Sequence, residues 1–378
     1  MNEHNWQGLF YLTAGFLSFF SLGVLFRVLS SRNAESSEVQ ADDTRWLGLE
    51  ELEIVDIVDE SHDIKSFVLR RTNGKNMPKY DPGQFLSFRI GNDDKVFRSY
   101  SISDSTENQN VIQVSIKKIP DGVGSNWFHS KKIGDKVFSH PPGGHFTNSG
   151  ITSERQVFIA GGIGITPFLS MASSARDMIS NKEMILFYGA KTLPDLAFHD
   201  DLLLLSKRFK NFTYVPVLSK ESPEGWLGEK GRINADLLKK HIGSFDNAKF
   251  LFCGPSPLID SLSASLIENG VTKAHILSEK FVSPTTISLD DIPFRKVSVE
   301  FDGTKYDYEG KENLLDYLEN QGAQIPFACR SGVCGACKVK VKNGKCTSLT
   351  DSGLSEEDKK DYILTCVSWP DSELQISS

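Results

Sequence analysis

Residues 329–337 read Cys-Arg-Ser-Gly-Val-Cys-Gly-Ala-Cys, and a further cysteine, Cys366, follows near the end of the chain. Cys329, Cys334 and Cys337 are thus separated by four and then by two residues. The chain holds six cysteines, so this one loop contains half of them. Such clustering is unlike the even cysteine framework of a small secreted disulfide protein, and it predicts a metal site in a reducing compartment.

A C-x4-C-x2-C spacing with one distant cysteine is the ligand pattern of a [2Fe–2S] cluster. The four predicted ligands are Cys329, Cys334, Cys337 and Cys366. The loop residues between them are small, which would let backbone N–H groups approach the sulfurs: Ser331, Gly332, Gly335 and Ala336. Zinc is the rival metal, but structural zinc sites favour two paired knuckles, which a single downstream cysteine does not supply. Cys346 falls outside the spacing and is expected to be a structural thiol.

The stretch IPFACRSGVCGACKVKVKNG, residues 325–344, resembles the cluster loop of plant-type ferredoxins. The resemblance covers residues ~296–378 and implies an α+β, β-grasp ferredoxin domain over 295–378. Within it, ENLLDYLENQG predicts an amphipathic helix that Gly322 ends. Residues 283–294 precede this unit and are interpreted as a linker.

A second motif, Arg98-Ser99-Tyr100-Ser101, follows a strand-like run. On a strand, Arg98 would present a cation for the flavin phosphates, Tyr100 an aromatic ring for one flavin face, and Ser101 a hydroxyl donor. Four residues match by chance easily, so an ordinary strand is the alternative.

The context of this motif supports a flavin site. Short alternating runs broken by turn signals occupy residues 47–150 and predict an antiparallel β-barrel. Lys117 and then the small-residue turn Gly122–Asn126 follow, and such a turn can present N–H groups to a pyrophosphate. A generic turn is the alternative interpretation of Gly124 and Ser125.

The order of these motifs resembles the ferredoxin–NADP reductase superfamily. That resemblance implies that Arg98, Ser99, Tyr100 and Ser101 hold the flavin and that the turn with Gly124 and Ser125 contacts its diphosphate. The Gly-Val-x-Ser-Asn form resembles members that bind FAD more than members that bind FMN.

Residues 151–282 change character, because apolar runs alternate with helix-like segments, as in a parallel α/β sheet. One run leads into a glycine-rich turn suited to hold a phosphate, with five candidate contacts: Gly161, Gly162, Gly164, Thr166 and Pro167. A plain strand-to-helix turn is the alternative, but the form GGIGITP resembles the NAD(P)-pyrophosphate turn of the same superfamily.

Two further stretches resemble that superfamily. Cys253-Gly254-Pro255 resembles its C-G-P motif, which places a cysteine beside the nicotinamide. Phe281 fits the aromatic that covers the flavin, and Glu279 fits a residue lining the pocket. A small buried thiol, a packed core phenylalanine and a solvated glutamate are the alternatives.

The nucleotide preference rests on two lysines. A 2′-phosphate needs cations, most often arginine. Segments 190–192 and 219–220 carry Lys191 and Lys220 and no arginine. A lysine holds a phosphate less firmly than a bidentate guanidinium does, so the sequence favours NADH over NADPH.

At the amino end, Leu9–Phe26 has 18 residues without a charge, near the lower limit for crossing a bilayer. The start carries Glu3 and neither Lys nor Arg, and no small-residue cleavage site follows. A retained transmembrane anchor over 1–30 is therefore favoured over a signal peptide or an interfacial helix. Arg27 and Arg32 then predict catalytic domains on the cytoplasmic side. Residues 31–46 are polar and are interpreted as a flexible tether.

The chain has 378 residues and a net charge of −7, which argues against a general nucleic-acid binder. Its order of units resembles reductase components of multicomponent oxygenases and hybrid-cluster-protein reductases, whose soluble members lack the amino-terminal span. The resemblance implies an NAD(P)H-dependent oxidoreductase that passes electrons through FAD and [2Fe–2S] to an acceptor protein such as an oxygenase, a desaturase or a hybrid-cluster protein. The predicted anchor indicates that this acceptor is associated with the membrane. A membrane-bound redox sensor with the same cofactors is the alternative.

Overall fold

The computed structural model describes residues 44–281, 292, 294–355 and 357–378. The predicted span Leu9–Phe26, most of the predicted tether and most of the predicted linker lie outside these residues. Within the described part of the chain, no helix has both the length and the apolar character needed to cross a membrane.

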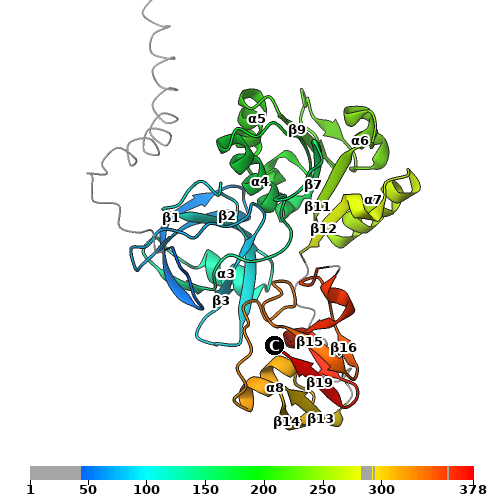
Figure 1. The fold of residues 1–378 in the computed structure, drawn as a ribbon. Helices are drawn as coiled ribbons and strands as arrows, with labels where there is room; N and C mark the ends of the chain where they lie inside the picture. The colour runs from blue at the N-terminus through cyan, green and yellow to red at the C-terminus, as the bar shows by residue number, and fades with distance from the viewer. Residues whose placement is uncertain (1–43, 282–291, 293, 356) are drawn as a thin grey trace, which may run out of the picture. The chain divides into compact units, whose positions relative to one another are not determined.

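The first domain is a six-stranded antiparallel sheet with the order β4-β3-β6-β1-β2-β5, which confirms the predicted antiparallel sheet (Figure 1). Its strands are β1 (Glu50–Asp59), β2 (Ile64–Arg71), β3 (Phe85–Arg89), β4 (Phe97–Ser101), β5 (Ile112–Lys117) and β6 (Lys136–Ser139). A bridge from Ile102, just after β4, to Val114 of β5 joins the two edge strands, so the sheet closes into a barrel. Helix α3 (Val123–His129) follows β5.

The barrel begins earlier in the chain than the sequence indicates. Trp46 is only 5% exposed and belongs to the barrel core, and the Arg71 guanidinium lies 5.4 Å from its ring centroid. Arg71 also donates hydrogen bonds to the backbone oxygens of Thr44 and Arg45 and pairs with Glu50. Residues 44–46 are therefore part of the folded domain and do not belong to the predicted flexible tether.

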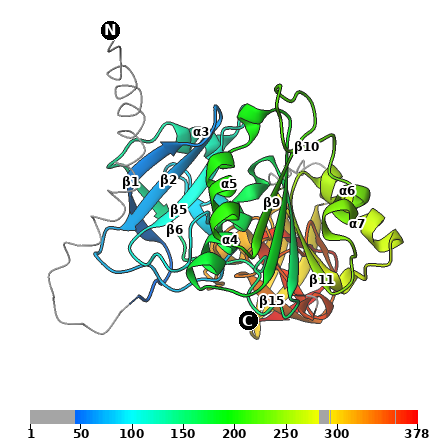
Figure 2. The same ribbon diagram turned by 90° about the horizontal axis from the view of Figure 1, so that it is seen from above.

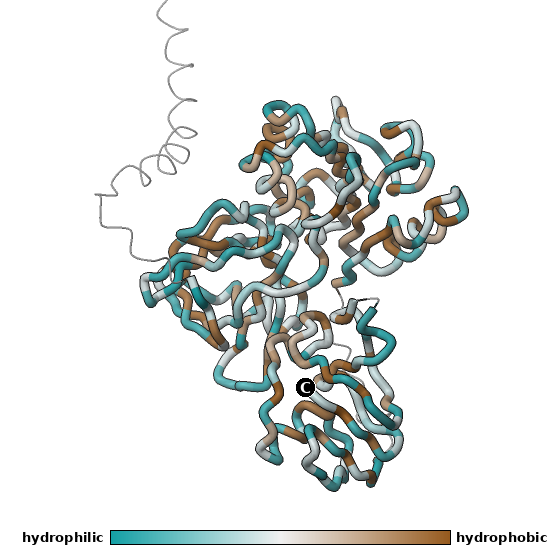
Figure 3. Tube along the Cα trace, in the orientation of Figure 1, coloured by the Kyte–Doolittle hydropathy of each residue, from teal (hydrophilic) through white to brown (hydrophobic). Residues whose placement is uncertain are grey.

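The second domain is a parallel sheet with the order β10-β9-β8-β7-β11-β12, as predicted. Its strands are β7 (Arg155–Gly161), β8 (Glu183–Ala190), β9 (Phe212–Leu218), β10 (Glu229–Lys230), β11 (Ala248–Gly254) and β12 (Ile276–Lys280). The central strands are almost wholly buried, because helices cover both faces, and Figure 3 shows hydrophobic stretches gathered along them.

The helices of this domain divide between the two faces of the sheet (Figure 2). They are α4 (Thr166–Asp177), α5 (His199–Arg208), α6 (Ala235–Ile242) and α7 (Ser256–Glu268). One hydrophobic core holds Phe168 of α4 and Leu202 of α5, and the other holds Leu238 of α6 and Leu262 of α7. This layering leaves the carboxyl ends of the strands at one edge, where ligands bind in open α/β sheets.

The third domain is a mixed sheet with the order β14-β13-β19-β15-β17, flanked by helix α8 and by the pair β16 and β18. Its elements are β13 (Arg295–Phe301), β14 (Thr304–Gly310), α8 (Leu314–Asn320), β15 (Lys338–Asn343), β16 (Cys346–Ser348), β17 (Tyr362–Leu364), β18 (Ser368–Pro370) and β19 (Leu374–Ser377). Asn313 caps α8 by accepting a hydrogen bond from the Asp316 backbone N–H. The predicted stop, Gly322, has a φ of +87°, a conformation that glycine adopts without strain.

Candidate functional site

The Arg98–Ser101 motif lies on β4, where successive side chains point to opposite sides. The Ser99 hydroxyl lies 2.9 Å from that of Ser87 on β3, while Arg98 and Tyr100 face α3. Burial raises the pKa of Tyr100, so its phenol stays protonated. Ser101 is buried at 6% exposure. The arrangement presents the cation and the aromatic ring together, as a flavin site requires.

Gly124 explains how α3 approaches this strand so closely. A methyl group at Gly124 would lie 2.5 Å from the Tyr100 hydroxyl and 2.6 Å from Cγ of Arg98. Only glycine therefore fits between the helix and the two motif side chains. The contact brings the predicted diphosphate turn and the predicted flavin strand to one place.

Two predicted contacts have protein partners. Ser125 donates its hydroxyl proton to the Gly122 backbone oxygen and accepts a hydrogen bond from the Ile119 backbone N–H. Lys117 forms a 2.5 Å ion pair with Asp63. Ser125 thus shapes the turn itself, and any phosphate contact by Lys117 competes with Asp63.

The nucleotide turn runs from β7 through Gly162 into α4, with Pro167 at the start of the helix. The Thr166 hydroxyl donates to the Ile163 backbone oxygen, which closes the turn. A side chain at Gly164 would collide with the Cys253 backbone oxygen, so the GGIGITP turn packs directly on the C-G-P motif. The two stretches that resemble nucleotide-binding motifs therefore form one surface.

On the neighbouring strand, Pro255 lies against Gly161, where an added methyl would come within 2.8 Å of its ring. Gly254 has a φ of +148° and packs on the Gly161 backbone. These contacts seat the end of β11 beside the end of β7, at the carboxyl edge of the sheet.

Cys253 and Glu279 face each other in register on β11 and β12. Burial, and then the charge of Glu279, raise the pKa of the Cys253 thiol. Burial raises the pKa of Glu279 to about 8. Its buried Oε2 has no hydrogen-bond partner among the described residues, although the residue as a whole is half-buried. A protonated carboxyl beside a neutral thiol is suited to donate hydrogen bonds to a ligand at this edge.

Phe281 follows directly after β12 and is 41% exposed. A core phenylalanine would be covered, so this ring is available to a planar ligand.

The four predicted cluster ligands converge. Thiols of Cys334 and Cys366 both lie within hydrogen-bonding reach of Cys329, and Cys366 is also within reach of Cys337. The Ser331 and Ala336 backbone N–H groups donate to the sulfurs of Cys329 and Cys334, each at 3.4 Å. This set of thiolates and N–H donors fits a [2Fe–2S] cluster. Among the described residues no group of three donors is placed for a single metal ion, whereas a two-iron cluster takes two thiolates per iron.

Arg330 ties the cluster loop to α8. Its guanidinium forms 2.5 Å ion pairs with both Asp316 and Glu319 and lies 3.9 Å from the Phe327 ring centroid. Arg330 also has a φ of +49°, a backbone conformation that residues other than glycine rarely adopt. The two carboxylates hold the loop in this strained turn directly after Cys329.

Three rings link the barrel to this loop. Phe97, directly before the flavin motif, packs 5.2 Å from the His140 ring and 6.2 Å from the Phe327 ring, measured between centroids. His140 and Phe327 are 5.7 Å apart. The roles of Phe97, His140 and Phe327 were not predicted from the sequence. The one local feature that could have drawn attention to His140 is that it and His145 flank a Pro-Pro-Gly-Gly turn.

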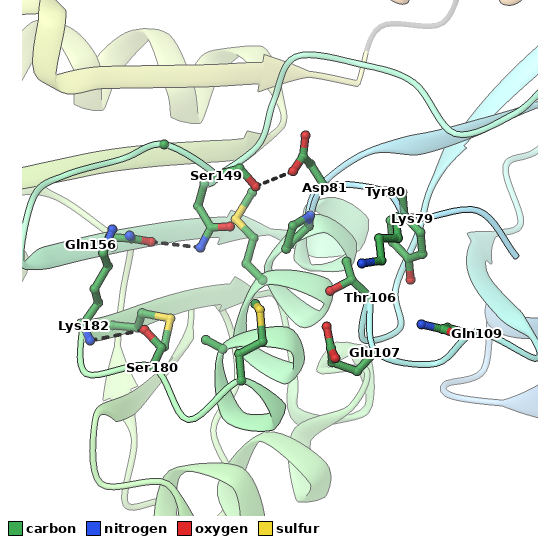
Figure 4. Close-up of a pocket in the computed structure, with 17 residues that line it drawn as sticks. Lys79, Tyr80, Asp81, Thr106, Glu107, Gln109, Ser149, Gln156, Ser180 and Lys182 are labelled. Atoms are coloured by element: carbon green, nitrogen blue, oxygen red, sulfur yellow. Dashed lines mark hydrogen bonds between the residues drawn. The ribbon is translucent and has the colours of Figure 1, made fainter. Parts of the chain in front are cut away.

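A cavity of about 420 Å³ lies between the barrel and the nucleotide domain (Figure 4). Its walls include Lys79 and Glu107 from the barrel side and Gln156 and Met184 near the starts of β7 and β8. The GGIGITP turn and the C-G-P motif lie instead at the carboxyl ends of β7 and β11. None of the predicted site residues lines the cavity. The cavity is thus separate from the nucleotide turn.

Family models match all three domains. Residues 51–148 match an oxidoreductase FAD-binding domain, residues 158–264 an oxidoreductase NAD-binding domain, and residues 299–371 a 2Fe-2S iron–sulfur cluster binding domain.

Known proteins share this order of domains. The glycine betaine monooxygenase reductase subunit of Chromohalobacter salexigens is 28% identical, covering 87% of this chain and 95% of its own length. NADH oxidoreductase HCR of Escherichia coli is 27% identical, covering 79% of this chain and 89% of its own. Among solved structures, a phthalate dioxygenase reductase matches 88% of this chain and 98% of its own with a TM-score of 0.60, at 24% identity.

The fold and the sites define an NAD(P)H-dependent flavin oxidoreductase that uses FAD and a [2Fe–2S] cluster. The chain is an FAD- and NAD-binding reductase of the ferredoxin–NADP reductase type with a C-terminal 2Fe-2S ferredoxin domain.

Proposed function

We propose that this chain is the reductase component of an oxygenase system, which takes electrons from NADH and delivers them singly to an oxygenase component. FAD supplies the exchange between hydride and single electrons, and the [2Fe–2S] cluster carries one electron at a time. The observation that carries the proposal is the ring contact between the flavin strand and the cluster loop, Phe97 to Phe327. The Chromohalobacter relative is a glycine betaine monooxygenase reductase subunit, which supports an oxygenase as acceptor.

The chain's own residues have distinct roles in this path. Arg98 and Tyr100 hold and cover the flavin. Glu279 and Cys253 form the neutral, buried wall against which the nicotinamide is placed, and Phe281 yields to it. These groups position the reacting rings and exclude water.

The test separates the two halves of the path. Replacing Cys334 by Ser removes one cluster ligand and leaves the barrel and the nucleotide domain intact. NADH should still reduce the flavin of Cys334→Ser in anaerobic stopped-flow measurements, while the [2Fe–2S] EPR signal disappears and electron transfer to cytochrome c falls at least tenfold. Cys346→Ser is the matched control, because Cys346 lies outside the ligand spacing. Transfer to cytochrome c at the wild-type rate in Cys334→Ser would contradict the linear path.

The choice of NADH rests on the ends of β8 and β9. The Lys220 backbone N–H donates to the Lys191 backbone oxygen, so the two lysines lie side by side at the carboxyl edge of the sheet. Neither segment offers the planar fork of an arginine to a 2′-phosphate. The name of the Escherichia coli relative supports NADH as well. Steady-state assays should give a higher kcat/KM for NADH than for NADPH.

The proposal includes a membrane anchor over Leu9–Phe26, with the catalytic domains on the cytoplasmic side and an acceptor associated with the membrane. Its support comes from the sequence: an uncharged run followed by Arg27 and Arg32. Such an anchor would raise the effective concentration of the reductase near its acceptor.

A further inference from the structure

The barrel segment Ser139–Phe146 lies against the cluster loop at two places. At one end, the His140 ring packs against both Phe97 and Phe327, which also contact each other. At the other, Nε2 of His145 lies 3.1 Å from the position that a methyl group on Gly335 would take. Gly335 stands between the second and third cluster ligands, so the segment meets the loop beside Cys329 and again beside Cys334.

His140 is placed by the barrel. Its backbone N–H donates to the Ser87 oxygen of β3 at 2.9 Å, and the neighbouring Ser139 hydroxyl donates to the His140 backbone oxygen at 2.8 Å. These bonds fix the residue from the flavin side of the contact. The ring therefore reaches the cluster loop as part of the barrel.

The His140 ring carries an unused polar atom. The residue is 8% exposed, and its buried Nε2 has no hydrogen-bond partner among the residues that the structure describes. Leaving such a buried polar atom unpaired is energetically unfavourable. Burial lowers the pKa of His140, so the ring is neutral and keeps a single N–H. The described residues thus leave Nε2 of His140 without a hydrogen-bond partner, and a bound group could supply one.

The charged groups around His140 come from the cluster loop. Cys329 and Arg330 are the two whose charges act on the imidazole, in opposite directions. Arg330 is already engaged by Asp316 and Glu319. Within the described part of the chain, Cys329 does not accept a hydrogen bond from Nε2 of His140. The ring nitrogen is therefore left for the cluster that this loop would hold.

We propose that His140 is a positioning residue for electron transfer, which holds the cluster loop against the flavin strand and donates its ring N–H toward the Cys329 side of the cluster. A hydrogen bond to a sulfur of the bound cluster would stabilise its more negative, reduced form and so raise its reduction potential. The bond therefore favours the passage of an electron from flavin to cluster. This inference rests on the proposed order of the electron path.

Three variants of the full holoenzyme separate the two parts of this role. His140→Phe keeps an aromatic ring and removes the N–H. His140→Gln removes the ring and keeps an N–H donor. His275→Phe removes an exposed histidine of the nucleotide domain and serves as the matched control.

The cluster potential is measured by EPR-monitored titration with dithionite and mediators, which needs no nucleotide. His140→Phe should lower the potential enough to shift the cluster equilibrium tenfold toward the oxidised form, about 59 mV for one electron. His140→Gln and His275→Phe should stay near the wild-type potential. Stopped-flow reduction by NADH should show an unchanged flavin phase and a slower cluster phase in His140→Phe.

A wild-type potential in His140→Phe would overturn the proposal, and so would an equal fall in His140→Phe and His140→Gln. If His140→Phe fails to fold, His140→Leu against His140→Gln gives the same comparison. A wild-type cluster that NADH cannot reduce would count against the proposed function and would leave the potentials of the variants comparable.

Discussion

Arg98 carries the first prediction at the scale of single residues. It is the cation of the flavin strand, and charge-assisted hydrogen bonds contribute about 1.5–3 kcal/mol each. Arg98→Ala should therefore weaken FAD binding by tens-fold, measured as flavin retained after gel filtration. Arg70→Ala is the matched control, because Arg70 lies on the same barrel, is exposed and pairs only with Glu53 among the contacts found for its side chain. Equal flavin retention in both variants would rule out the role of Arg98.

Glu279 predicts a pH dependence. Burial raises its pKa from the usual 4.5 to about 8, so the carboxyl is protonated below that pH and ionises as the pH rises through it. An ionised Glu279 could not donate a hydrogen bond to a nicotinamide bound where the proposed function places it. The rate of flavin reduction by NADH should fall as the pH rises above about 8.

The amide of Glu279→Gln remains neutral across this range, so its flavin reduction should lose the step near pH 8. Both proteins are followed by stopped-flow absorbance between pH 6 and 9.5. A step of unchanged size in Glu279→Gln would assign the pH dependence to another group.

The roles of residues with a characteristic spacing could be predicted from the sequence, because cysteines at fixed intervals and glycines before a helix serve few other functions. The spacing of Cys329, Cys334 and Cys337 led directly to a set of thiols that the fold brings together. His140 could not be found this way. Its position matters only because Phe327, from a distant part of the chain, packs against it.

At the scale of elements, the contact between α3 and β4 depends on one missing methyl group. Gly124→Ala would place Cβ 2.5 Å from the Tyr100 hydroxyl, so the helix must shift away from the flavin strand. Overpacking of this kind costs about 1–3 kcal/mol. Both the melting temperature and the FAD affinity of Gly124→Ala should fall.

Gly143→Ala provides the control for this change. Gly143 lies in the same barrel, and an added methyl there meets nothing within 4 Å. Its melting temperature, measured by circular dichroism, should match the wild type. If the melting temperature of Gly124→Ala also matches the wild type, α3 and β4 are not packed as tightly as the structure indicates.

Elements with a strong pattern agree with the sequence analysis. Runs that were apolar throughout became the parallel strands β7, β8, β9 and β11. The closing of the barrel depends on the bridge from Ile102 to Val114, and the two-residue strand β10 depends on pairing with β9. Such features arise from tertiary contacts, which local patterns do not contain.

At the scale of the whole molecule, the amino-terminal segment is predicted to act on turnover and not on chemistry. A truncation beginning at Thr44 keeps the backbone oxygens that Arg71 binds and the buried Trp46. It should bind FAD and retain NADH–ferricyanide activity. With the native acceptor in membranes its turnover should fall, and excess truncated enzyme should restore it.

A second truncation, beginning at Leu47, is the informative comparison. It removes Trp46 and the backbone oxygens of Thr44 and Arg45 that Arg71 binds, so its melting temperature should be lower than that of the Thr44 truncation. Loss of flavin from the Thr44 truncation would make the preceding segment part of the fold. If the Thr44 truncation at low concentration turned over with the membrane acceptor as fast as the full chain, the anchor would have no effect on the rate.

The contact between Phe97 and Phe327 also sets an order of events during synthesis. Domains fold as units while the chain leaves the ribosome, beginning at the amino end. The barrel is complete long before Phe327 is made, and the whole nucleotide domain is translated between the two rings. A nascent chain can thus acquire a flavin that NADH reduces before it has any route for releasing single electrons to a partner. Until the ferredoxin domain is complete, electrons on such a flavin would have no cluster to which they could pass.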